Sequence, residues 1–417
     1  MGKPRASGDV RTGALASGSG GATAPLLPRN DRKADAKVQG GSLFMVLLST
    51  AVAVCGAFEF GTCVGYSAPT QSGIERELGL SMAEFAIFGS VLTIGAMIGA
   101  VTSGRLADSL GRKMGATMLY FGRTLLGFCT GVLSYVVPVF IAEIAPKDLR
   151  GGLATSNQLL IVCGSSTTYI TGALVTWRNL VLVGIVPSVL LLVGLLFIPE
   201  SPRWLAQAGR EEEFHASLQR LRGENADISE EAIEIKEYIE SLQSFPRARI
   251  QDLFLSRNIY AVIVGVGLMI FQQLGGINGV GFYASFIFSS AGFSGKLGTI
   301  LIGIVQIPIT LLGAFLMDRS GRRVLLMVSA SGTFLGCFLA GISFYLKAHG
   351  LFLEWVPALA LSGILVYIGA YSIGMGPVPW VIMSEIFAIN IKAIGGSLVT
   401  LISWLGSFAV SYSFNFL

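Results

Sequence analysis

The segment Asp108-Ser109-Leu110-Gly111-Arg112-Lys113 returns later in the chain as Asp318-Arg319-Ser320-Gly321-Arg322-Arg323, and both copies follow the pattern D-x-x-G-R-[RK]. An acidic residue at the end of an apolar stretch, with a basic residue seven positions later, follows each copy: Glu143 and Arg150, then Glu385 and Lys392. One basic loop is a common topology anchor between membrane helices. Two copies of the motif, each followed by an acid and a base at the same spacing, predict a chain built from two related halves.

The two copies differ in the number of residues between the motif and the acidic residue that follows it. Asp108 and Glu143 lie 35 positions apart, whereas Asp318 and Glu385 lie 67 apart. The first half is therefore shorter by about one membrane helix and a loop. We predict that a helix after Lys113 is missing from this chain. Because the sequence stops at Leu417 on an apolar span, we expect the last helix to be missing too.

The composition is that of a membrane protein. Hydrophobic residues make up 53% of the 417 positions and charged residues only 13%, about half the usual share. Residues 1–41 hold ten of the charged side chains and residues 209–249 hold sixteen. This distribution excludes a water-soluble enzyme. The sequence also lacks a nucleophile–base pair, a metal-ligand set and a phosphate-binding loop, so we predict no enzyme activity, no cofactor and no metal.

Apolar windows of about 20 residues predict ten membrane helices. The windows are 43–66, 83–106, 117–142, 153–174, 178–198, 258–288, 296–317, 323–346, 355–386 and 391–416. The expected fold class is an all-α polytopic membrane protein with two pseudo-symmetric helical halves. We divide the chain into a tail (1–42), an N-terminal membrane half (43–208), a linker (209–257) and a C-terminal membrane half (258–417).

The tail and the linker carry the charge outside the spans. The net charge of +4 resides in residues 1–41, which are rich in Gly, Ser and Ala and are expected to be disordered. A basic tail before the first span marks the cytoplasmic side of the membrane and does not indicate nucleic-acid binding. In the linker, apolar residues at i, i+4 and i+7 predict short amphipathic helices: Phe214, Leu218 and Leu221, then Ile235, Ile239 and Leu242.

Five motifs in order resemble the sugar porter family of the major facilitator superfamily: Gly104–Lys113, Pro138–Glu143 with Arg150-Gly151, Pro199–Trp204, Gln272–Asn278 and Gly376–Trp380. The stretches Phe58–Tyr66 and Ser134–Phe140 are similar to the plant early-responsive-to-dehydration-like branch. The resemblance implies the major facilitator fold with twelve helices, both termini inside, and transport of a monosaccharide by alternating access. We expect a monomer in the lipid bilayer, with the vacuolar membrane favoured and the plasma membrane as the alternative.

Neutral amides lie deep in the apolar spans. A carboxamide both donates and accepts hydrogen bonds, as binding of an uncharged polyol requires. Such residues serve either as glue between helices or as a solute path. The pair Gly275-Gly276 can break its helix and bring Asn278 back toward Gln272 and Gln273. By resemblance, substrate contacts are expected at Gln158, Gln272, Gln273, Asn278 and Gln306.

Trp380 follows Gly-Pro-Val-Pro, so its helix cannot be regular at that point. An indole can lie on the apolar face of a pyranose ring, and we include Trp380 among the substrate contacts. The alternative is a tryptophan of the membrane–water interface.

Charged residues gather at the cytoplasmic helix ends in both halves. We predict that they form a gate whose ion pairs hold one conformation shut and separate in the other. The alternative is a set of solvated charges that only fix topology. Because Lys392 has no guanidinium, it cannot pair with Glu385 in a bidentate manner. The gate residues are Arg105, Asp108, Arg112, Glu143, Arg150, Glu200, Arg203, Asp318, Arg322, Glu385 and Lys392.

One acid lies within the first span. Proton-driven members of the family carry an Asp in this helix, and here Cys63 falls near that position, with Glu59 one turn earlier. A membrane-embedded acid is a functional candidate by default. We hypothesise that Glu59 carries a proton, with Arg123 tuning its pKa. The alternative is a structural ion pair in a facilitator.

Two further interpretations compete with transport of a sugar. The missing spans also suit a transport-incompetent truncated isoform, or a sugar sensor of the same fold that signals through its tail. A carrier of an organic ion would be favoured by a charged residue near Gln158 or Gln272, and the sequence has none there.

Overall fold

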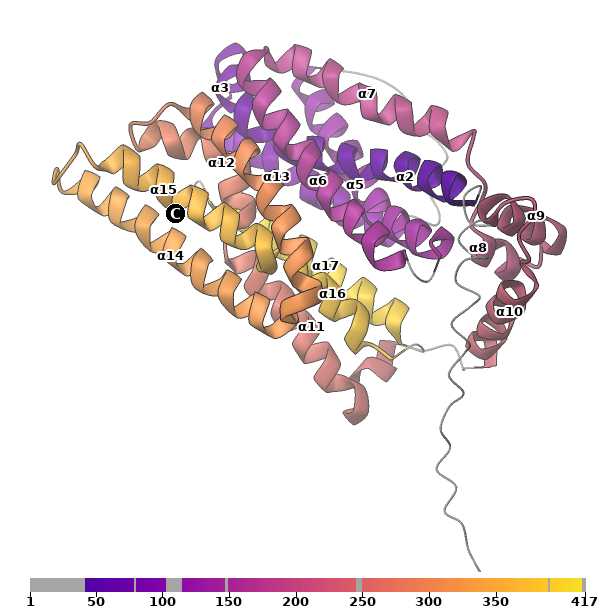
Figure 1. Ribbon diagram of the computed structural model, residues 1–417. Coiled ribbons are helices and arrows are strands. Elements are labelled where there is room, and N and C mark those ends of the chain that lie inside the picture. The colour runs from indigo at the N-terminus through magenta and orange to yellow at the C-terminus, as the bar shows by residue number, and fades with distance from the viewer. Residues whose placement is uncertain are drawn as a thin grey trace, which may run out of the picture.

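The computed structural model describes residues 42–78, 80–102, 115–146, 149–244, 250–388 and 391–414. Within these ranges the regular structure is entirely helical (Figure 1). The predicted tail, apart from Ser42, lies outside the described residues. Eight helical stretches in the described part are long and apolar enough to cross a membrane. Helices α4 and α6 fall on the two other predicted spans, so the expected ten spans all appear as helices.

The first half consists of one long helix surrounded by its neighbours. Helix α2 packs against α5, α6 and α7. Its backbone comes very close to that of α6, because Gly61 faces the carbonyl of Ile161 and Gly164 faces that of Phe58. Such close approach is typical of membrane helices with small residues at the contact. The helices of this half are α2 (Ser42–Gly65), α3 (Ser67–Leu78), α4 (Met82–Thr102), α5 (Gly115–Ile144), α6 (Arg150–Leu174) and α7 (Trp177–Leu195).

Helices α4 and α5 follow each other in the chain and yet run in the same direction. Phe88 of α4 lies under the guanidinium of Arg123, at 4.9 Å, and one turn later in both helices the carbonyl of Leu92 meets Gly127. Two parallel membrane helices require a return crossing between them. In the second half two helices separate Arg322 from Glu385, whereas α5 alone leads to Glu143. Both observations agree with the predicted loss of a helix after Lys113.

The second half contains two helix breaks within predicted spans. The span 258–288 is divided at Gly276, which has a φ of +88° that favours glycine. The span 355–386 is divided by a short π-helical segment, η2, before the Pro-containing turn. The elements of this half are α11 (Ser256–Leu274), α12 (Ile277–Ser290), α13 (Gly295–Ser320), α14 (Arg322–Ala348), α15 (Val356–Ala370), η2 (Tyr371–Met375), α16 (Val378–Ile386) and α17 (Lys392–Ser413).

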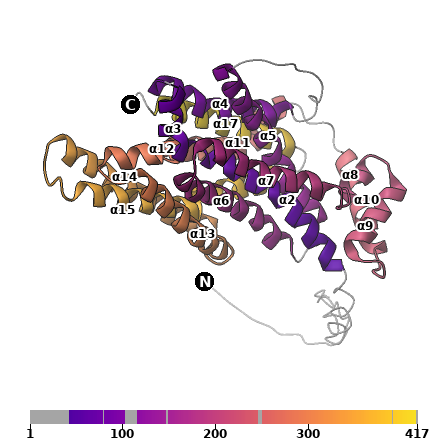
Figure 2. The ribbon, with the colours of Figure 1, turned by 90° about the horizontal axis from the view of Figure 1, so that it is seen from above.

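The linker forms a small helical unit at one end of the membrane bundle, and α3 lies at the other end (Figure 1, Figure 2). Its helices are α9 (Glu211–Arg222) and α10 (Ser229–Ser244), and α8 (Pro202–Gln207), at the end of the predicted first half, packs against both. The short η1 (Ile250–Phe254) packs instead against α11 and α17. Phe214, Leu218 and Leu221 are fully buried, which confirms the first predicted stripe. Within the second stripe, Ile235 is buried and Ile239 packs against the same cluster.

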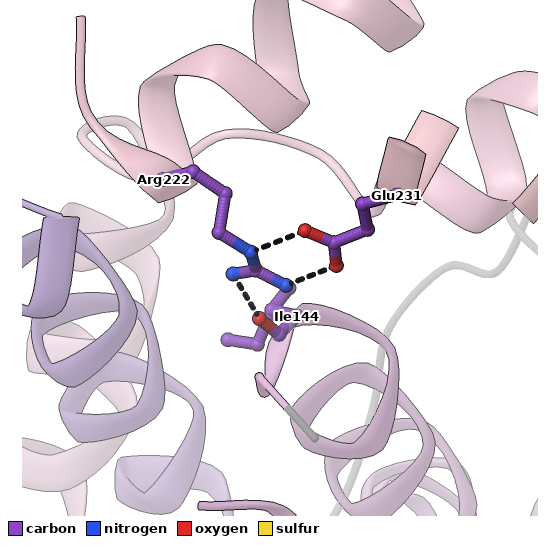
Figure 3. A network of polar contacts seen from close by, with 3 residues as sticks. All are labelled: Ile144, Arg222 and Glu231. Atoms are coloured by element: carbon purple, nitrogen blue, oxygen red, sulfur yellow. Dashed lines mark hydrogen bonds and ion pairs between the residues drawn. The ribbon is translucent and has the colours of Figure 1, made fainter. Parts of the chain in front are cut away.

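Arg222 attaches the linker to the first half. Its guanidinium donates two hydrogen bonds to Glu231, of 2.8 and 2.7 Å, and one of 3.1 Å to the carbonyl of Ile144 at the end of α5 (Figure 3). A cation suits this position because the last carbonyls of a helix have no partner within the helix. Beside it, Leu221 packs with Val46 and Ile144. The linker therefore sits on the ends of α2 and α5.

The two halves meet along α6–α13 and α4–α17 and are sealed at the end away from the linker. One buried cluster joins Ala68 and Tyr169 of the first half to Ala284, Phe288 and Tyr367 of the second. The hydroxyl of Tyr169 also donates a 2.9 Å hydrogen bond across the interface to the carbonyl of Gly281. A second cluster adds aromatic rings from both halves: Phe85, Phe88, Phe282 and Tyr283.

The Arg222 attachment predicts a specific loss of stability. The Arg222 side chain is 12% exposed, so its replacement by Ala should lower the free energy of unfolding by about 2 kcal/mol. Arg210 makes an equally bidentate contact with Glu213 but is 50% exposed, and Arg210→Ala should cost about 0.5 kcal/mol or less. Thermal unfolding of the purified variants in detergent measures both. Equal losses in the two variants would contradict this role of Arg222.

The sealed end gives a second prediction. Tyr169→Phe removes one cross-interface hydrogen bond and should raise the population of the opened state about five- to tenfold. The reporter is a cysteine placed at the fully buried Ala284 after the natural cysteines have been replaced. Its labelling rate with a water-soluble maleimide should rise in Tyr169→Phe and stay unchanged in Tyr260→Phe, where the ring is exposed. Unchanged labelling in Tyr169→Phe would show that this bond does not hold the seal.

Candidate functional site

The amides at the break between α11 and α12 form a connected network. Asn278, in the first turn of α12, donates from Nδ2 to Oε1 of Gln273 at 2.6 Å. Gln273 in turn donates from Nε2 to the hydroxyl of Ser403 on α17 at 2.9 Å. The glycine pair thus breaks the helix as the sequence predicts, and it brings Asn278 to Gln273 and not to Gln272. These two amides are bonded to each other, so a solute that used both would have to replace that bond.

Gln272 connects the first helix break to the second. Its Nε2 donates to the carbonyls of Met375 and Gly376, at 2.6 and 3.0 Å, where η2 leaves backbone groups without helical partners. The hydroxyl of Tyr367 completes the arrangement with a 2.8 Å bond to the carbonyl of Gly275. Gln272 is 1% exposed, and its Oε1 accepts no hydrogen bond from the described residues.

Several other buried polar atoms at the contact between the halves are also without a hydrogen-bond partner among the described residues. They are Oε1 of Gln306 on α13, Nε1 of Trp404 on α17 and Oγ of Ser166 on α6. The two halves approach here, because Gly303, one turn before Gln306, faces the carbonyl of Ser166, and Phe60 of α2 contacts Trp404 at 6.1 Å between ring centroids. A buried unpaired polar atom costs free energy, and hydroxyl groups of a bound solute would remove that cost.

Gln158 and Trp380 are the remaining two predicted contacts. Gln158 is half-buried on α6. Trp380, near the start of α16, packs partly buried against a cluster that includes Met269, Phe387 and Val399. Sequence reasoning missed Trp404, Ser403 and Ser166. A polar-tipped side chain within an apolar span is the signal that could have found them, but serines at such positions are too common to single out.

Glu59 and Arg123 line one cavity of about 320 Å³, but they do not form the predicted pair. Arg123 donates to the carbonyl of Cys63 at 2.9 Å and to the hydroxyl of Ser67, and it lies over the rings of Tyr66 and Phe88. Oε1 of Glu59 accepts a 3.5 Å bond from the thiol of Cys63. Its Oε2 is buried and has no partner among the described residues. Cys63 therefore stands between the acid and the base.

The charged residues at the linker end pair differently from the sequence expectation. In the second half, Glu385 pairs with Arg322 at 3.0 Å, and Lys392 is exposed at the start of α17. In the first half, Glu143 accepts a 2.5 Å hydrogen bond from Ser201, the residue that caps α8. Glu200 accepts the backbone N–H of the same serine at 2.9 Å, and Arg203 lies over Tyr238 at 5.4 Å.

Five of the predicted gate residues have no described side chain. Arg105, Asp108 and Arg112 lie outside the described residues, and Arg150 and Asp318 are described in their backbone only. The Arg322–Glu385 ion pair lies within the second half. At the sealed end the halves are joined by the Tyr169–Gly281 bond and two apolar clusters.

Comparison with known proteins gives consistent matches in sequence and fold. Residues 115–417 match the family model described as "Sugar (and other) transporter". Sugar transporter ERD6-like 16 of Arabidopsis thaliana is 58% identical over an alignment that covers 94% of this chain and 86% of that protein. Sugar transporter ERD6-like 7 of the same plant is 54% identical, with 90% and 85% covered.

Solved structures extend the match to the fold. The inward-open conformation of the xylose transporter XylE from E. coli matches with a TM-score of 0.71 and 25% identity, covering 89% of this chain and 90% of that one. The proton:xylose symporter XylE bound to 6-bromo-6-deoxy-D-glucose, described as a major facilitator superfamily protein, matches with a TM-score of 0.70, 25% identity and 89% of each chain covered. The chain thus has the major facilitator fold, and it belongs to the sugar transporter family, next to the plant ERD6-like proteins.

Proposed function

We propose that this protein carries a monosaccharide across a membrane by alternating access. The observation that carries the proposal is that three buried, uncharged side chains of the second half have a polar atom without a partner among the described residues: the amide oxygens of Gln272 and Gln306 and the indole nitrogen of Trp404. Acceptors and a donor are both present, as the hydroxyl groups of a sugar require. The ERD6-like relatives are named as sugar transporters, and the matching solved structures are of a xylose transporter.

The absence of charge from this group suits a carrier. Hydroxyls of the sugar would donate to the two amide oxygens and accept from the indole, while Gln273 and Asn278 exchange their mutual bond for bonds to the ring substituents. Gln158 and Trp380 complete the proposed contacts from the first half and the second half. Neutral hydrogen bonds of this kind support millimolar affinity, about 4 kcal/mol, and a carrier must release its load.

Alternation of access follows from the uneven contacts of the two halves. In the described conformation they are joined at the end away from the linker by the Tyr169–Gly281 bond and two apolar clusters. Opening that end requires the halves to rotate, and the linker moves with the first half because Arg222 holds it to α5. The gate charges would then pair across the halves in the opposite state.

Transport is either facilitated or proton-coupled, and we propose Glu59 as the proton carrier in the coupled case. Its carboxylate lies within a membrane helix, next to a cavity, with one oxygen unpaired. Arg123 would sense its charge through Cys63, whose carbonyl it binds and whose thiol bonds Glu59. We further propose a monomer in the vacuolar membrane, with the plasma membrane as the alternative, and a fluorescent fusion separates the two locations.

Substitution of an unpaired amide should weaken sugar binding without unfolding the protein. Gln306→Leu keeps the size of the side chain, and its loss of one hydrogen bond to the sugar should raise the KM about tenfold. Counterflow of labelled hexoses into proteoliposomes measures it. Gln71 is also a buried amide with an unpaired oxygen, but it lies in α3 away from the proposed contacts, so Gln71→Leu is the matched control.

Two results would contradict this proposal. An unchanged KM in Gln306→Leu would remove this residue from the site. No counterflow of any hexose by wild-type protein that is folded by circular dichroism would leave the transport-incompetent isoform or sensor as the function.

Proton coupling has its own test. Glu59→Gln cannot release a proton, so accumulation driven by a pH gradient should be lost while counterflow without a gradient continues. Glu75→Gln, on α3, serves as the control because that carboxylate lies outside the cavity lining. Gradient dependence that persists unchanged in Glu59→Gln would reject the proton role.

A further inference from the structure

The cavity beside Glu59 is large, mostly apolar and separate from the amide network. Its volume is about 320 Å³, and α2, α4, α5, α6 and α7 all contribute to its wall. Gly122 and Gly184 line it, and a Cβ added at either would meet nothing within 4 Å. The apolar and aromatic side chains of the wall include Phe58, Tyr66, Phe88, Leu126, Leu180 and Ile185.

The cavity opens sideways onto the apolar surface of the bundle. Three residues of its wall, Leu126, Val181 and Ile185, are 42%, 45% and 49% exposed, so they lie at the mouth on the faces of α5 and α7. A surface of this composition faces the hydrocarbon of the bilayer. In the second half, α14 packs along the length of α15. In the first half α4 packs along α5, and α5 is the one described helix between the first charged repeat and Glu143.

The carboxylate of Glu59 supplies the polar end of the cavity. The hydroxyls of Ser188 and Thr62 lie beside the carboxylate in the cavity wall, but its buried Oε2 accepts no hydrogen bond of full geometry from the described residues. No Lys or Arg nitrogen of the described residues lies within 4 Å of the carboxylate. The guanidinium of Arg123 is already engaged by Cys63, Ser67 and two aromatic faces. A buried carboxylate without a counter-ion is costly, and a cation that entered the cavity would remove that cost.

We propose that this cavity binds an amphipathic organic cation that enters from the bilayer. A primary ammonium group donates a hydrogen bond to Oε2 of Glu59, and an aromatic or alkyl body lies against Phe58 and the apolar side chains of α5 and α7. The aromatic or alkyl part of the ligand partitions into the hydrocarbon of the bilayer, and the cavity opens toward that hydrocarbon. The site does not share residues with the amide network, and its existence does not depend on sugar transport.

The test compares two ligands of the same shape. The probe is 2-phenylethylammonium, which is protonated at neutral pH, and 2-phenylethanol is its uncharged counterpart. Calorimetric titration of the purified full-length protein, corrected for partition into detergent alone, should show saturable binding of the ammonium compound. Glu59→Gln should weaken its binding about ten- to hundredfold and leave the alcohol almost unchanged, because only the ammonium forms a charge-assisted bond.

Two further variants separate the carboxylate from the space around it. Gly184→Leu fills the cavity and should weaken both ligands together. Glu75→Gln, outside the cavity, should change neither. The proposal is wrong if the ammonium compound shows no saturable binding, or if it binds Glu59→Gln and wild type equally. The sugar counterflow assay is independent of each of these results.

Discussion

The bilayer offers no water to hydrogen-bond with the backbone, and this constraint determines where the protein can place a polar site. A membrane helix satisfies its own backbone, and a break in it must be satisfied by side chains. At the break after α11, the hydroxyl of Tyr367 bonds the carbonyl of Gly275. At η2, Ser329 accepts from the N–H of Met375, and Gln272 donates to the carbonyls of Met375 and Gly376. The two breaks therefore support each other, and Gln272 is both a structural bridge and the owner of an unpaired oxygen at the proposed site.

This double role bears on how glue and site can be told apart. From the sequence, we interpret an amide in a membrane span either as a contact between helices or as part of a solute site. In the structure, one end of the Gln272 amide is fully used by the backbone, while the other end is unused by the described residues. The structural bonds fix the orientation of the side chain, and a fixed orientation aims the free oxygen. Because the side chain is already ordered, less conformational entropy is lost when a sugar binds.

Features with a clear periodic or conformational cause were predictable from the sequence. The ten spans follow from hydropathy, the break at Gly275-Gly276 follows from glycine, and the linker helices follow from the stripe of Phe214, Leu218 and Leu221. The ion pairs were not predictable in the same way. Arg123 and Glu59 were paired by their charge, but a guanidinium in hydrocarbon is satisfied equally well by a carbonyl, a hydroxyl and aromatic faces. Glu143 bonds Ser201, 58 positions later, because the linker folds back onto α5, which no local pattern reveals.

The parallel arrangement of α4 and α5 affects the outer surface of the first half more than the polar contacts proposed for the sugar. The proposed sugar contacts lie on α6, α11, α12, α13, α16 and α17, so a missing neighbour of α5 removes none of them. What it does change is the outer wall of the first half, where the cavity beside Glu59 reaches the apolar surface. An outer wall of this kind keeps the chemistry of the interface between the halves, and it lets a solute of the bilayer reach the cavity in which Oε2 of Glu59 is buried.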